Sequence, residues 1–128
     1  MDRLKYDEVA AREGMEPLRA MKLLAKASMG YVGVSAAYRT ILYYAGWEWL
    51  KVFHATDHPL AQSTRGMAFC EVIPLICPEF SQEDVDSLDV VSIDEAEEKA
   101  YIDEMEETEG LDPDTMYAIR HSYELLLA

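Results

Sequence analysis

The hydrophobic and polar residues of this chain recur at helical spacing over most of its length. Residues 17–28 predict an amphipathic helix that starts at Pro17, because proline is tolerated in the first turn of a helix. The polar side of this helix carries a basic stripe, in which the side chains recur every three or four residues: Arg19, Lys22 and Lys26. Residues 2–13 predict a shorter helix, which Gly14 interrupts.

Residues 36–54 predict the central helix of the molecule. Ser35 is placed to cap its first turn. Its large apolar side chains point in nearly every direction, so they cannot all face one neighbour: Ile41, Leu42, Tyr43, Tyr44, Trp47, Trp49, Leu50, Val52 and Phe53. We therefore expect this helix to run through the middle of a bundle, with Gly46 allowing either a close approach by a neighbour or a slight bend.

Prolines divide the segment that follows the central helix. Residues 56–59, Thr-Asp-His-Pro, predict a turn. A further helix is expected over residues 60–73, and Pro74 and Pro78 should end it, because the residue before a proline is disfavoured in helical conformation.

Capping residues mark the starts of the C-terminal helices. Ser81, with Asp84 three residues on, predicts a helix start, but the apolar residues that follow leave a short strand open as an alternative: Val85, Leu88, Val90 and Val91. Ser92 and Glu95 match a capping box, which predicts a helix that reaches Glu109.

The last helix has the clearest amphipathic pattern. Asp112 is expected to cap it and Pro113 to take its first position. Its core face is predicted to hold Met116, Ile119, Tyr123, Leu126 and Leu127. Together these patterns predict an all-α protein, a compact bundle of about five to six helices that ends in an acidic helical pair and forms a single domain over residues 1–128.

Charge is distributed unevenly along the chain, whose net charge is −14. Residues 1–78 hold nine Lys and Arg against eight Asp and Glu, whereas residues 79–128 hold two against seventeen. The first part is therefore near-neutral and expected to form the core, and the second part is acidic. Such an asymmetry disfavours direct binding of nucleic acid through its phosphates and favours a basic partner.

The helix predicted from Ser92 to Glu109 is polar in most directions. It has only two thin apolar strips, one with Ala96 and Ala100 beside Ile93, the other with Tyr101 and Met105. A helix with so little to bury needs a partner, and the basic stripe is expected to pair with it, either within the chain or between protomers. Its carboxylates are the predicted partner-binding residues: Asp94, Glu95, Glu97, Glu98, Asp103, Glu104, Glu106, Glu107 and Glu109.

Other patterns that could carry chemistry are incomplete. The set that most resembles a metal site is His54, Asp57, His58, Cys70 and Cys77. The two cysteines are too far apart in sequence, because zinc sites place theirs about two to four residues apart, so a capped helix end and core thiols are favoured. No calcium-loop, di-iron, phosphate-loop or nucleophile motif is complete. The sequence thus predicts neither an enzyme nor a bound cofactor or metal.

The N-terminal residues lack the apolar segment of an export signal. The most apolar stretch, residues 31–53, contains Arg39, Glu48 and Lys51, so it is expected to be a core helix that does not cross a membrane. Both cysteines lie in an apolar stretch, which is typical of reduced core thiols. We therefore expect a cytoplasmic protein, in the host cell if the chain is viral.

Two functions from different classes are compatible with this sequence. The first is a small acidic inhibitor, such as a phage protein, that mimics nucleic acid and occupies the basic surface of a host nuclease or a defence complex of the restriction or CRISPR type. The alternative is a viral or cellular structural adaptor that self-associates through its apolar helices, for example as a homodimer. A solubilising role for the charges is the plainest interpretation.

Overall fold

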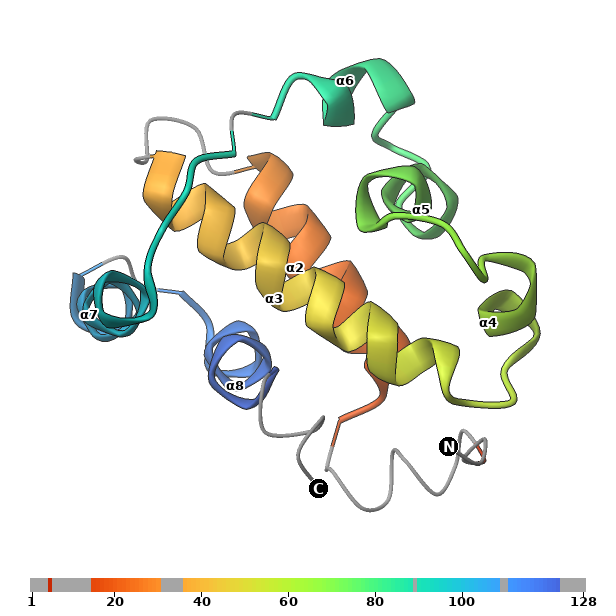
Figure 1. The fold of residues 1–128 in the computed structure, drawn as a ribbon, viewed down its shortest axis with the longest axis horizontal. Helices are drawn as coiled ribbons and strands as arrows, with labels where there is room; N and C mark the ends of the chain where they lie inside the picture. Colours follow the sequence, from red (N-terminus) through yellow and green to blue (C-terminus); the bar gives the residue numbers. More distant parts are fainter. Residues whose placement is uncertain (1–4, 6–14, 31–35, 89, 109–110, 123–128) are drawn as a thin grey trace.

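The structure is a computed structural model that describes residues 5, 15–30, 36–88, 90–108 and 111–122. These residues form seven α-helices and no strand (Figure 1): α2 Pro17–Gly30, α3 Ala36–His54, α4 Pro59–Ser63, α5 Phe69–Ile76, α6 Gln82–Asp86, α7 Glu95–Thr108 and α8 Pro113–His121. The predicted all-α fold is confirmed. The helix predicted over residues 2–13 and the cap predicted at Ser35 lie outside the described residues.

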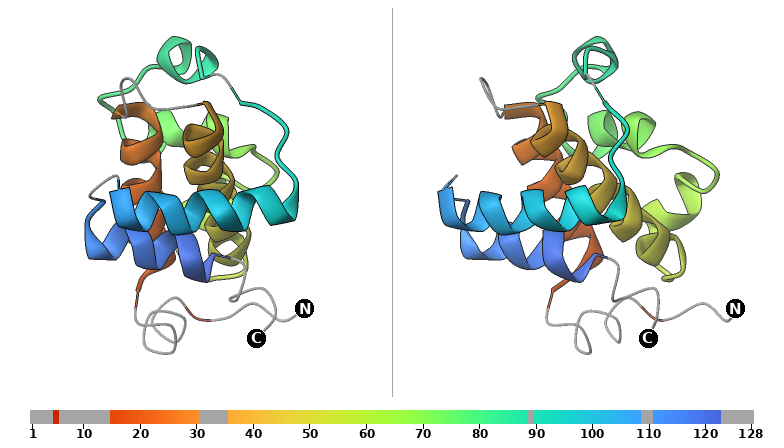
Figure 2. Two further views of the ribbon diagram at one scale, coloured as in Figure 1. Left: turned by 90° about the vertical axis from the view of Figure 1, so that its left-hand side faces the viewer. Right: turned by 60° about the vertical axis from the view of Figure 1, so that its left-hand side comes forward.

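The central position predicted for residues 36–54 is confirmed, because α3 contacts helices on all sides. Helix α2 packs along it in the most extensive interface of the molecule. Helices α4 and α5 lie on one side of this pair and α7 and α8 on the other (Figure 1). Helices α7 and α8 run side by side in opposite directions (Figure 2). The acidic side chains are concentrated on α7, since α8 has Asp114 in its first turn and Arg120 and His121 in its last.

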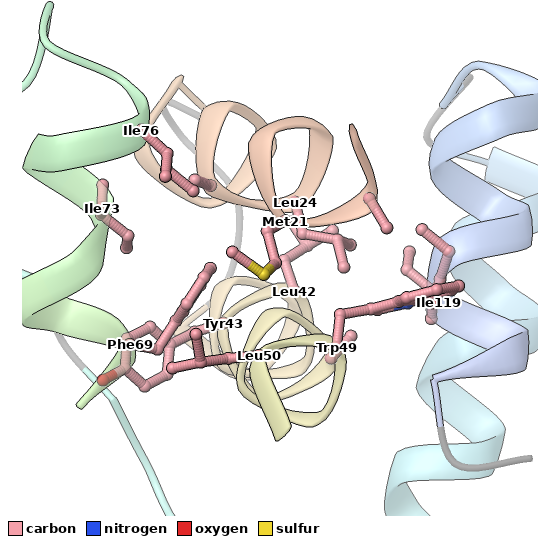
Figure 3. Packing of buried hydrophobic residues seen from close by; sticks show 14 of the residues in the cluster. Met21, Leu24, Leu42, Tyr43, Trp49, Leu50, Phe69, Ile73, Ile76 and Ile119 are labelled. Carbon is pink, nitrogen blue, oxygen red and sulfur yellow. Dashed lines mark hydrogen bonds between the residues drawn. The ribbon is translucent and has the colours of Figure 1, made fainter. Parts of the chain in front are cut away.

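One hydrophobic core joins these helices. Its largest fully buried side chains come from α2, α3, α5, α7 and α8: Met21, Leu24, Leu42, Trp49, Leu50, Phe53, Phe69, Val72, Ile73, Met105 and Ile119. Figure 3 shows Phe69 from α5 on one side of α3 and Ile119 from α8 on the other. Each large apolar side chain contributes about 1.5–3 kcal/mol on burial. The acidic helix is therefore attached to a folded core that does not depend on its charges.

Gly46 provides the close approach that was expected of it. A Cβ atom at this position would overlap the ring of Phe69, which is fully buried. Helix α5 can pack this closely on α3 only because Gly46 has no side chain.

The single helix predicted over residues 60–73 is wrong. The chain turns after α4, where Gly66 has a φ of 84°, and α5 then contains Pro74 instead of ending before it. Proline cannot donate to the carbonyl four residues earlier, which belongs to Cys70. The Nε2 atom of Gln82 donates to that carbonyl at 3.3 Å. A side chain from α6 thus replaces the missing backbone hydrogen bond, and the helix continues through the proline.

The helix start predicted at Ser81 is confirmed, and among the described residues the alternative strand does not form. The Oγ atom of Ser81 accepts from the backbone N–H of Asp84 at 3.1 Å, and the Ser81 N–H donates to the Asp84 carboxylate at 3.0 Å. This reciprocal pair is a capping box, and it satisfies two backbone N–H groups that the first turn of a helix leaves without partners.

The helix start predicted at Ser92 is wrong by two residues, because Asp94 takes the capping position. Helix α7 begins at Glu95, and the Asp94 carboxylate accepts from the backbone N–H of Glu97 at 2.8 Å. The residues before it cross α3, where the Val91 N–H donates to Thr40 Oγ1 at 3.0 Å. This hydrogen bond keeps the residues before Asp94 outside the helix. Asp94 then caps the first turn, and aspartate is as good a helix cap as serine.

The start of the last helix is as predicted. The Asp112 carboxylate accepts from the backbone N–H of Thr115 at 2.9 Å, and Pro113 takes the first helical position. Met116 and Ile119 are buried, whereas the other predicted core residues, Tyr123, Leu126 and Leu127, lie outside the described residues.

Within the described part of the chain, no helix combines the length and the apolar character needed to cross a bilayer.

Candidate functional site: the acidic helix α7

Helix α7 is attached to the bundle by a narrow apolar strip. Met105 is fully buried, and Tyr101 and Ile102 are half-buried against the core. The Tyr101 ring meets the ring of Tyr38 on α3 edge to face, with centroids 5.7 Å apart. Helical spacing puts these α7 residues on one face, so the rest of the helix turns outward. The strip predicted through Ala96 and Ala100 is wrong, because both are exposed.

The predicted partner-binding residues line the outward faces of α7. Among the described residues, Glu98 is half-buried, and Asp94 and the other acidic side chains of the helix are exposed. Glu109 lies outside the described residues. Helical spacing separates them into two flanks. One flank faces α8, and the opposite flank, called here the outer row, consists of Glu97, Glu104 and Glu107.

Arg120 of α8 is the counter-charge for the flank that faces α8. Its guanidinium forms ion pairs with the carboxylates of Asp103, at 3.0 Å, and Glu106. Hydrogen bonds to Asp103 and then to Glu106 raise the pKa of Arg120 further above its usual value. All three side chains are more than a third exposed, so each pair contributes only about 0–1 kcal/mol. These pairs orient α7 on α8 more than they stabilise it.

Repulsion between carboxylates is visible at the start of α7. The charge of Asp94 is the largest of the effects that raise the pKa of Glu97 above its usual value. Acidic residues are favourable in the first turn, where the helix dipole is positive, but the side chains in the middle of the helix do not gain this compensation. Helix α7 therefore keeps a concentration of negative charge that opposes its own folding.

Within one chain, Arg19 and Lys26 of the basic stripe pair with residues outside α7, whereas pairing between protomers stays a prediction. Arg19 forms an ion pair with Asp114, at the start of α8, and Lys26 lies 3.9 Å from the carboxylate of Glu79, before α6. Both partners belong to the acidic part of the chain and lie outside α7, and α2 packs against α8.

The candidate metal set separates into groups with different contacts. His58 caps α4, where its Nδ1 atom accepts from the backbone N–H of Leu60 at 3.1 Å. The Nε2 atom of His54 lies 3.2 Å from Thr64 Oγ1, and burial lowers the pKa of this histidine. Burial also raises the pKa of Cys77. Across the described residues, no three His, Cys, Asp or Glu side chains are grouped as metal ligands would be.

An open groove of about 500 Å³ lies between α7 and α8. Its lining combines apolar and charged side chains from the two helices, among them Glu95, Glu98, Lys99, Ile102, Ile119 and Arg120. His121 also lines it and stacks on Tyr117, with ring centroids 4.1 Å apart. The residues from α8 were not predicted to belong to a site. The sequence signal that could have pointed to them is that Lys99 and Arg120 are the two lysine or arginine residues within residues 79–128.

Comparisons with protein families, curated proteins and solved structures yield nothing that matches this chain. What it does must therefore be inferred from its own residues.

Proposed function

We propose that this chain is a small acidic inhibitor that mimics nucleic acid and binds the basic nucleic-acid-binding surface of another protein through α7. The observation that supports it is the way α7 is attached. Three side chains, Tyr101, Ile102 and Met105, hold the helix to the core, and its carboxylates point outward over most of its circumference. The target class is a nuclease or a host defence complex, and the site of action is the cytoplasm of that host.

The linear charge density of α7 suits this role. The helix has seven carboxylates and one lysine in 14 residues. At a rise of about 1.5 Å per residue, one carboxylate occurs roughly every 3 Å along the axis. One strand of duplex DNA carries a phosphate about every 3.4 Å. A basic groove that follows a nucleic acid strand would therefore meet a similar density of negative charge on α7.

The outer row is the part of α7 best placed to meet such a groove. Arg120 binds carboxylates on the flank that faces α8, and helical spacing puts Glu97, Glu104 and Glu107 on the other flank. Carboxylates gathered on one flank of an attached helix can be complementary to a basic surface.

The experiment compares two variants with the same net charge. The outer-row variant replaces Glu97, Glu104 and Glu107 by glutamine, and the control variant carries Glu79→Gln, Glu83→Gln and Asp86→Asn, around α6. Each protein is immobilised and exposed to host lysate at low and high salt, and bound proteins are then eluted with duplex DNA or with RNA. We expect nucleic acid and salt to release a basic nucleic-acid-binding protein from the wild type and the control variant, and the outer-row variant to retain little of it.

Two outcomes would contradict the proposal. The first is that nothing is released by nucleic acid from the wild-type protein. The second is that both variants lose binding equally, because the effect would then follow from net charge alone, as a solubilising or non-specific role predicts.

A second function, self-association as a structural adaptor, is favoured by a different surface. Tyr44 is 45% exposed and Val90 38% exposed, and with the half-buried Trp47 they line an open groove of about 480 Å³ on α3. Trp49 cannot contribute to an interface, because it is fully buried in the core. Sedimentation equilibrium tests this function. An oligomer that Tyr44→Ser dissociates would support it, and a monomer at all concentrations would exclude it.

A further inference from the structure

We infer that the groove between α7 and α8 accepts one arginine side chain of the basic partner. This inference rests on the function proposed for α7 and names the chemical group that the helix would recognise. It follows from three properties of the groove, namely its apolar floor, the carboxylates at its edge and the way its own cations are held.

The floor of the groove is apolar. Ile119 is 1% exposed and Ile102 is half-buried, and the two come from different helices. An arginine side chain has a hydrocarbon stem that packs on apolar surface while its charged end stays at the edge. The guanidinium is planar and more weakly hydrated than an ammonium group, so arginine loses less than lysine when it enters a partly enclosed site.

The edge of the groove is acidic. Glu95 is exposed and Glu98 is half-buried, and they lie one turn apart on α7. Carboxylates at this spacing can form charge-assisted hydrogen bonds with a guanidinium group. Glu95 is the better test residue, because its exposure makes a substitution there compatible with the fold.

The cations of the groove do not cancel this preference. Arg120 is bound by Asp103 and Glu106, so its charge is already offset within the protein. Lys99 is exposed on α7 and its flexible chain can extend into solvent. When Arg120 is counted together with Asp103 and Glu106, the acidic side chains in and around the groove outnumber the basic ones. This excess of negative charge is complementary to a cationic side chain.

The probe for this inference is a blocked glycine peptide with one central arginine, and its matched control has citrulline, which has nearly the same shape without the charge. The readout is the NMR signal of the isoleucine methyl groups. We expect Ile102 and Ile119 to shift saturably with the arginine peptide and little with the citrulline peptide, while Ile73 and Ile76, which are buried on α5, stay unchanged. Hexanoate serves as an anionic probe of similar length.

Two substitutions of equal charge locate the binding site on α7. Glu95→Gln should weaken binding of the arginine peptide by about 1.5- to 5-fold, as for an exposed ion pair, whereas Glu107→Gln, outside the groove, should have a smaller effect. Circular dichroism checks that both variants stay helical.

The inference is overturned if arginine and citrulline peptides act alike, if hexanoate but not arginine moves Ile102 and Ile119, or if both substitutions weaken binding equally. None of these results would contradict the proposed inhibitory function, because the lysate experiment with the outer-row variant tests that function separately. If arginine enters the groove but nucleic acid releases no partner, the inhibitory function fails while the binding site remains.

Discussion

The indole Nε1 atom of Trp49 donates a hydrogen bond of 2.7 Å to the carbonyl oxygen of Ala118, which joins α3 to α8 inside the core. This carbonyl lies in the last turn of α8. In a regular α-helix it would accept from the N–H of Ser122, but that N–H donates to the carbonyl oxygen of Ile119 instead. The tryptophan therefore gives a helix-end carbonyl a partner in a place that excludes water. Figure 3 shows Trp49 extending from α3 toward α8. Because α7 packs on both α3 and α8, this contact also helps to position the acidic helix.

Replacing Trp49 by phenylalanine should lower the free energy of unfolding by about 1–3 kcal/mol, because the buried carbonyl of Ala118 loses its donor and a cavity forms. Urea unfolding followed by circular dichroism measures the change. Trp47→Phe is the matched control, since Trp47 is half-buried, and it should cost less. A larger loss in the control than in Trp49→Phe would contradict the core position of Trp49.

Gly46→Ala should destabilise the protein although alanine is the better helix former by about 1 kcal/mol. The added Cβ atom would overlap the buried ring of Phe69, and overpacking of this kind costs about 1–3 kcal/mol. Gly30→Ala is the control, because nothing lies within 4 Å of a Cβ atom there. Thermal and urea unfolding of the two variants should show a loss for Gly46→Ala alone. An equally stable Gly46→Ala protein would mean that α3 and α5 are not packed this closely.

The cap of α8 should make stability depend on pH in a defined direction. Hydrogen bonds from Thr115 lower the pKa of Asp112. A lowered pKa in the folded protein stabilises it above the unfolded value of about 3.9, and this stabilisation is lost as the pH falls through the folded pKa. Asp112→Ala should therefore cost about 1 kcal/mol at neutral pH and progressively less in acid.

Asp112→Asn provides the control for this effect. Asparagine caps a helix about as well as aspartate but carries no charge. The difference between Asp112→Asn and Asp112→Ala should stay constant across the acid range, when both are compared by urea unfolding at each pH. A constant difference between the wild type and Asp112→Ala down to strongly acid pH would show that the charged carboxylate is not the cap.

Arg120→Gln should have little effect on folding. Its ion pairs with Asp103 and Glu106 are exposed, so their loss should cost at most about 1 kcal/mol, and less at high salt. The substitution makes the α7 face more negative and should leave binding of a basic partner unchanged or tighter. Surface plasmon resonance with the protein captured from lysate measures this, and weaker binding would indicate that Arg120 itself contacts the partner.

The sequence predicted those features of the helices that depend only on residues within one segment. The caps at Ser81 and Asp112 and the central position of residues 36–54 each follow from side-chain type and spacing within one segment. The division of residues 60–73 could not be predicted in this way. Pro74 stays inside α5 because Gln82, from a different helix, donates to the carbonyl that the proline leaves without a partner.

The candidate site was predictable in composition but not in arrangement. The density of carboxylates on α7 can be read from the sequence. The strip with Tyr101 and Met105 was predicted and packs on the core, but the strip with Ala96 and Ala100 is exposed, and the counter-charge of α7 is Arg120 and not the predicted basic stripe. These features depend on the packing of α7 and α8 side by side, which no spacing within one helix encodes.

Under the proposed function, the acidic face of α7 and a nucleic acid compete for the same basic surface. The most direct measurement is the fluorescence anisotropy of a labelled duplex, bound to the protein captured from lysate, as this chain is added. We predict that the anisotropy falls to that of free DNA, that higher salt weakens the competition, and that the outer-row variant is a poorer competitor than the control variant around α6. Anisotropy that stays unchanged or rises, as in a ternary complex with DNA still bound, would contradict the claim.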